Sequence, residues 1–206
     1  MKGWIAALAL GFPLFAGGQN AAPEAESASL SAGPTQAKSW RGVGTVEYVV
    51  RHPLHTVRGK SRKVEIRAVA DGSGLKVMGR AEVRSFDSGN SNRDAHMLEA
   101  VRADRHPLVV LRGLARGFRV PAVPATFSLP LDSEVQLAGV AAPVAISAQV
   151  EQLPDGSWKV QFAFDHRLSA HSIERPKLLL VPVEDEITVR GEALLEAIDA
   201  KVDAQK

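Results

Sequence analysis

Apolar and charged residues alternate with a period of two over several long segments of this chain. The pattern is clear from Lys63 to Ala68 and again from Leu75 to Arg84. Successive side chains of a β-strand point to opposite faces, so these segments predict strands with one buried and one solvated face. Similar inward-facing sets are Val46, Tyr48 and Val50; Val144, Ile146, Ala148 and Val150; Trp158, Val160, Phe162 and Phe164; and Ile187 and Val189.

Strands with a single apolar face must pack on another sheet or close on themselves. Turn sequences at Asp71–Gly74 and Leu153–Gly156 separate neighbouring strands. We therefore predict an all-β fold, a single antiparallel β-barrel of about eight strands. One short helix is expected from Asn92 to Ala103, capped by Ser91 or Asn90, and a C-terminal helical tail around Glu192–Val202.

The inward positions mix small and large side chains. Small ones, such as Gly79 and Ala148, leave a cavity or merely fit the taper of a barrel, and the pattern alone leaves both open. Trp40 and Trp158 are expected in the core.

The N-terminus has the pattern of an export signal. Lys2 precedes an apolar run, Trp4–Ala16, that is shorter than the roughly 20 residues of a membrane-spanning helix. We divide the chain into a signal peptide (1–18), a flexible leader (19–38), a barrel domain (39–198) and a tail (199–206). A periplasmic or secreted protein that does not span the membrane is expected.

Composition excludes several classes of protein. The chain has no cysteine, which rules out disulfides, thiolate metal sites and a lipidated cysteine. A net charge of +2 and 5% aromatic residues argue against a nucleic-acid partner. The sequence leaves the oligomeric state open, with a dimer as one option.

Several short motifs occur in a consistent order along the chain. A first strand ends at a histidine, a Gly/Asn turn opens the helix, and a Gly-Val-x-x-Pro turn and a closing segment follow. These motifs are Gly44–His52, Phe86–Asn90 with Arg93–His96, Leu137–Val144, and Ser172–Pro176 with Val183–Ile187. In this order the chain resembles the YceI-like family of periplasmic proteins.

The resemblance implies a lipocalin-like barrel with an apolar tunnel for a polyisoprenoid, an isoprenoid quinone or another long-chain amphipathic lipid. It implies no cofactor and no covalent chemistry. His52, Arg93 and His96 are candidates for the rim or the ligand head group. The chain departs from the family at Lys60, among other positions, which leaves the ligand's identity open. The residues expected to bind the ligand are Tyr48, Val50, Ile66, Val77, Val83, Trp158, Phe162 and Phe164.

Parts of the sequence are compatible with two other functions. A hydrolase would use Ser88 or Ser91 with Asp94 and His96, yet helical residues two apart point in different directions, and no Gly-x-Ser-x-Gly elbow occurs. We therefore expect Asp94 to stabilise the helix start and Arg93 to bind a carbonyl or carboxylate. A filled barrel with a stress or interaction role would need no ligand.

The histidines do not have the spacing of a metal site. His52 and His55 would face opposite sides of a straight strand, and nothing in the spacing requires His166 or His171 to complete a site. No metal is therefore expected, and His52 is expected to form a hydrogen bond at a strand end. The acidic run Glu184–Glu186 is typical of a solvated strand edge.

Overall fold

A computed structural model describes residues 37–178 and 181–198, so the predicted signal peptide, nearly all of the leader and the tail lie outside the described residues. The elements are β1 (Lys38–His52), β2 (His55–Asp71), β3 (Gly74–Glu82), the 3-10 helix η1 (Val83–Ser85), α1 (Ser91–Ala100), β4 (Leu108–Arg116), β5 (Ala125–Leu137), β6 (Val140–Gln152), β7 (Trp158–Arg167), the 3-10 helix η2 (Leu168–His171), β8 (Lys177–Leu178), β9 (Val181–Pro182) and β10 (Glu186–Ile198).

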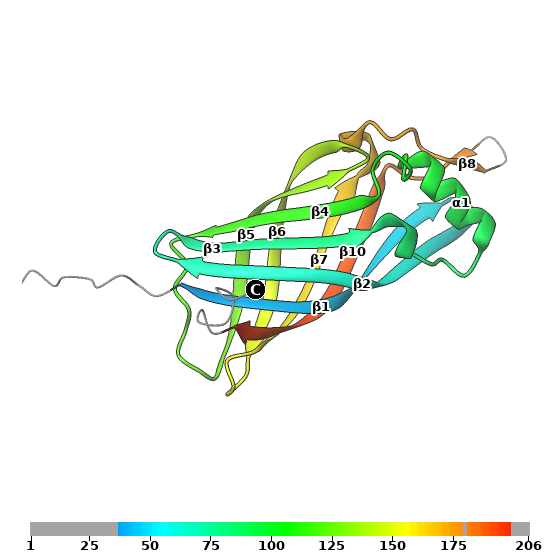
Figure 1. Ribbon diagram of the computed structural model, residues 1–206. Coiled ribbons are helices and arrows are strands. Elements are labelled where there is room, and N and C mark those ends of the chain that lie inside the picture. Colours follow the sequence, from blue (N-terminus) through cyan, green and yellow to red (C-terminus); the bar gives the residue numbers. More distant parts are fainter. Residues whose placement is uncertain (1–36, 179–180, 199–206) are drawn as a thin grey trace, which may run out of the picture. The chain divides into compact units, whose positions relative to one another are not determined.

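Eight antiparallel strands close into a barrel in the order β1-β10-β7-β6-β5-β4-β3-β2 (Figure 1). The first and last long strands close it, since β1 pairs with β10 from Ser39–Ile198 to Val50–Ile187. Strands β8 and β9 form a separate small hairpin. The predicted all-β barrel and its short helix are confirmed.

The segment predicted to begin a C-terminal helix is a strand. β10 continues to Ile198, with Ala193 and Leu195 buried and Leu194 and Glu196 exposed. This is a period of two, and the segment pairs with strands on both sides, so ladder hydrogen bonds override its helical propensity. The rest of the predicted helix, 199–202, lies outside the described residues.

The hairpin of β5 and β6 is joined to the rest of the barrel along only part of its length. Its own two strands pair throughout, from Ala125–Gln152 to Leu137–Val140. By contrast, β4 pairs only with residues 132–136 of β5, and β7 pairs only with residues 148–152 of β6. Each side of the hairpin therefore has an unpaired half.

Different side chains occupy the two unpaired halves. Beside β5, Phe118 follows the end of β4 and packs against Phe127 and Trp158. Beside β6, the short helix η2 covers the gap, and the imidazole of His171 bonds to the carbonyl of Val140. The barrel is thus completed by side chains where backbone pairing stops.

Candidate functional site

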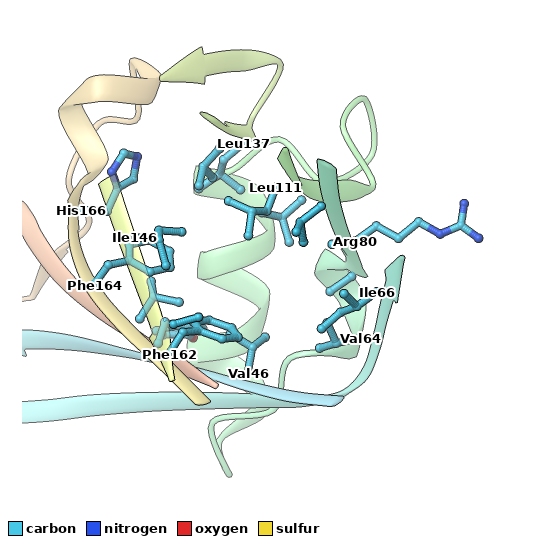
Figure 2. Close-up of a pocket in the computed structure, with 18 of the residues that line it drawn as sticks. Val46, Val64, Ile66, Arg80, Leu111, Leu137, Ile146, Phe162, Phe164 and His166 are labelled. Carbon is cyan, nitrogen blue, oxygen red and sulfur yellow. The ribbon is translucent and has the colours of Figure 1, made fainter. Parts of the chain in front are cut away.

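The barrel encloses a cavity of about 240 Å³ whose wall comes from the inward faces of all eight barrel strands. Met97 of α1 and Val101, the residue that follows the helix, complete the wall at one end. Along β7 the wall runs from Trp158 to His166, which is roughly 26 Å at the usual rise of a strand. The cavity is therefore long, narrow and almost wholly apolar (Figure 2).

Small inward residues create this space. At Gly79, an added Cβ would meet only the Cβ of Leu111, at 3.7 Å, which is an ordinary contact. Ala68, Ala81 and Ala148 lie on the same wall and are buried. The small residues left unexplained by the sequence thus border open space inside the barrel.

Two other inward positions require glycine because an aromatic ring lies against them. The ring of Tyr48 lies across Gly59 on the neighbouring strand, where an added Cβ would be 2.4 Å from its Cζ. Phe162 covers Gly191 in the same way, at 2.6 Å. These glycines let two aromatic rings lie flat against the wall and keep the cavity open.

All eight residues expected to bind the ligand line the cavity. They are Tyr48, Val50, Ile66, Val77, Val83, Trp158, Phe162 and Phe164. The end near Trp158 is aromatic: Trp158 stacks on Trp40 with ring centroids 4.1 Å apart, and both are buried as predicted. Arg80 also borders the cavity, but its guanidinium points away from it and bonds to Glu65 outside (Figure 2).

The three predicted rim residues do not belong to the cavity wall. His52 is buried at the end of β1, where Nδ1 accepts from the N–H of Leu54 and Nε2 donates to the carbonyl of Val181, both at 3.2 Å. Arg93 donates to the carbonyl of Ser88 at 2.9 Å. His96 is exposed, 3.6 Å from a carboxylate oxygen of Glu99.

The Asn90–His96 segment organises the start of α1. Asn90 is its N-cap, with Oδ1 accepting from the N–H of Arg93 at 3.0 Å. Asp94 accepts from the N–H of Ser88, so Asp94 and His96 bond to different groups. Tyr48 lies near this segment: burial, reinforced by the charge of Asp94, raises the pKa of Tyr48 to about 12.

His166 is a cavity residue that the sequence reasoning did not place there. It continues the inward series of β7 and is 9% exposed. Its Nε2 lies 2.6 Å from Nε2 of His171, and Nδ1 of His171 lies 2.9 Å from the carbonyl oxygen of Val140. Burial, with the neighbouring His171 second, lowers the pKa of His166.

The described part of the chain has neither a cluster of metal ligands nor a membrane-spanning helix. In residues 37–178 and 181–198, no three His, Cys, Asp or Glu side chains group as they would around a metal ion. His52 and His55 do lie opposite each other across the β1–β2 hairpin, with ring centroids 5.2 Å apart. The helices within these ranges include none that is long and apolar enough to cross a membrane.

The fold and cavity together define a small antiparallel barrel with an apolar interior. The family model described as YceI-like domain matches residues 41–194, and the chain belongs to this family.

Solved structures share the fold at low sequence identity. A polyisoprenoid-binding domain from Saccharophagus degradans is 12% identical with a TM-score of 0.64, over 77% of this chain and 98% of that one. BcnA from Burkholderia cenocepacia is 16% identical with a TM-score of 0.60, over 73% and 95%. The Campylobacter jejuni YCEI protein is 16% identical with a TM-score of 0.52, over 72% and 89%. No curated protein sequence matches the chain.

Proposed function

We propose that this protein binds an amphipathic isoprenoid-type lipid in the barrel cavity, and sequesters or carries it without covalent chemistry. The observation that carries the proposal is the apolar wall built by all eight strands around a long, narrow space. Each methylene removed from water contributes about 0.8 kcal/mol, so a prenyl chain gains affinity without any catalytic group.

Family membership and a structural neighbour support this ligand class. The Saccharophagus degradans neighbour is a polyisoprenoid-binding domain. The residues weighed for hydrolysis favour binding over turnover, because Asp94 and His96 bond to different partners at the surface of α1. We further propose that the protein is exported, on the strength of Lys2 and the apolar run that follows it.

Filling the cavity tests the proposal. We expect Gly79→Leu to place a side chain in the open space beside Leu111 and to displace the bound lipid. The matched control is Arg80→Gln, since the neighbouring Arg80 points outward. Gly79→Ala adds one carbon in ordinary contact, and we expect it to retain most of the lipid.

The measurement is mass spectrometry of an organic extract from folded protein, purified from a bacterial periplasm. We expect a long-chain lipid near stoichiometry with the wild type and Arg80→Gln, and its loss with Gly79→Leu. A cooperative urea transition in every variant shows that the barrel is intact. If Gly79→Leu keeps its lipid, the cavity is not the binding site. An empty wild type, even after incubation with lipids, would favour the filled-barrel alternative.

A further inference from the structure

The cavity wall contains one side chain that can serve as a buried hydrogen-bond acceptor. Of the lining residues with polar atoms, Arg80 points outward, and Nε1 of Trp158 is a buried donor. The phenol of Tyr48, which can both donate and accept, belongs to a residue that is only partly buried and whose ring lies across Gly59. His166 remains, at the end of the inward face of β7 that is farthest from Trp158.

The hydrogen bonds of His171 determine which nitrogen of His166 carries a proton. The carbonyl of Val140 can only accept, so Nδ1 of His171 carries the proton of that bond. In neutral His171 the other nitrogen, Nε2, is then an acceptor, and the proton shared at 2.6 Å must come from Nε2 of His166. Nδ1 of His166 is consequently unprotonated, with a free lone pair.

No group in the described ranges bonds to that Nδ1, and the His166 side chain, 9% exposed, lines the cavity. A ligand in the cavity that carries a hydrogen-bond donor therefore finds an acceptor there that no protein group occupies. The paired histidines have a structural origin. η2 lies beside the stretch of β6 that β7 does not pair, and from there His171 bonds to the carbonyl of Val140.

We propose that the cavity selects apolar ligands that end in a hydroxyl group, which donates to Nδ1 of His166 while the chain extends toward Trp158. The inference rests on the proposed lipid-binding function and specifies its ligand class. A prenyl alcohol and an isoprenoid quinol both carry such a hydroxyl. A quinone carbonyl is only an acceptor, so it cannot donate to Nδ1, and the neutral imidazole of His166 does not compensate the charge of a diphosphate.

The environment of His166 supports a neutral ligand. Burial and the neighbouring His171 lower its pKa, which keeps the imidazole uncharged near neutral pH. The other lining residues bring no charge into the cavity, since Arg80 bonds to Glu65 on the outside.

Titration calorimetry with matched probes tests the proposal. The first set is farnesol, its methyl ether and farnesyl diphosphate, and the second is a short-tailed ubiquinone with its quinol. We expect wild-type protein to bind farnesol about tenfold more tightly than the ether, the typical effect of one buried hydrogen bond. The quinol should bind more tightly than the quinone by a similar factor. The larger of the two preferences, farnesol over its ether or quinol over quinone, indicates whether the hydroxyl belongs to a prenyl alcohol or to a quinol.

The variant His166→Phe removes the acceptor and keeps an aromatic ring. We expect it to bind farnesol and the ether equally, at the affinity that the wild type has for the ether. Since His166→Phe also leaves His171 without its partner, ¹⁵N spectra of the wild type provide a check that needs no variant. The unprotonated Nδ1 signal of His166 should move toward lower shift with farnesol and stay in place with the ether.

The outcomes separate the two proposals. Three outcomes would each overturn the hydroxyl inference and leave lipid binding intact. The wild type binds farnesol and the ether equally, or it binds the diphosphate or the quinone most tightly, or its preference for farnesol survives in His166→Phe. An unmoved Nδ1 signal in the presence of bound farnesol would overturn it as well. Failure of every probe to bind would refute the proposed function and this inference with it.

Discussion

The contact between Tyr48 and Gly59 allows a sharp test of how the cavity wall is built. An added Cβ at Gly59 would lie 2.4 to 2.5 Å from three atoms of Tyr48, closer than van der Waals contact permits. The φ of Gly59 is outside the left-handed region, so alanine itself fits the backbone. Only the tyrosine ring stands in the way.

Two effects of opposite sign determine the magnitude. Replacing glycine by alanine stabilises by about 0.4–1 kcal/mol through the unfolded chain. Overpacking against the ring destabilises by about 1–3 kcal/mol. We therefore expect Gly59→Ala to lower the free energy of unfolding by about 1–2 kcal/mol, which corresponds to roughly 2–8 °C in Tm for a domain of this size.

A second background reverses the sign. Tyr48→Ala costs roughly 3 kcal/mol by itself, as the loss of a large, mostly buried ring. With the ring absent, we expect Gly59→Ala to stabilise by about 0.4–1 kcal/mol. Gly79→Ala, where the new Cβ has room, should stabilise the wild type by the same amount.

Urea unfolding of the four proteins of this cycle, followed by circular dichroism, gives the coupling energy. We expect a coupling of about 1–3 kcal/mol. If Gly59→Ala has the same effect with and without Tyr48, the ring does not lie across Gly59 and the argument about the wall fails.

Three further predictions follow from other groups. The folded protein binds a proton at His166 more weakly than the unfolded chain does. The contribution of His166 to stability should therefore be complete above its ordinary pKa of 6.5 and fall as the pH drops below that value. Urea unfolding from pH 8 to 5 measures this, and the same dependence of stability on pH in His166→Phe would contradict it. Tyr48 is the only tyrosine, so ultraviolet titration of the folded protein should show one midpoint near 12. The stabilising effect of the protonated phenol should be lost as the pH rises above 10. A midpoint at 10 in the folded protein would contradict the burial of Tyr48. Asn90→Ala should lower the free energy of unfolding by about 1 kcal/mol, because it removes the N-cap of α1. The control Asn92→Ala, inside the helix, should change the free energy of unfolding little. Equal losses of stability in the two variants would argue against the cap.

The sequence predicts the inward faces well because alternation is a local property of each strand. The same rule extends to residues that were not assigned. Phe127, Leu129, Leu131 and Val135 alternate with polar residues along β5, although Pro130 interrupts the pattern. The structure tolerates Pro130 because β4 pairs only from Asp132 onward, so the missing N–H faces no partner strand.

The polar part of the site depends on contacts between distant segments. Alternation places His166 inward, one step after Phe164, and that signal was available. Its hydrogen-bonded state was not, since it depends on His171 in η2 and on the carbonyl of Val140. The expected structural role of the Asn90–His96 motif is confirmed by the contacts of Asn90, Arg93 and Asp94 at the start of α1, and its contact with a ligand head group stays a prediction.

The partial attachment of the β5–β6 hairpin has a consequence for motion. The two stretches that join it to the barrel lie at opposite ends of the hairpin: residues 132–136 are near its turn, and residues 148–152 are near its open end. Parting β4 from β5 breaks few ladder hydrogen bonds, yet it uncovers Leu129 and Leu131 of the cavity wall. We expect such a barrel to open sideways at this short ladder by a sub-global fluctuation, while longer ladders such as β1–β2 and β1–β10 stay paired. Exchange of a ligand through this opening then requires the release of one strand pair, and not the unfolding of the domain.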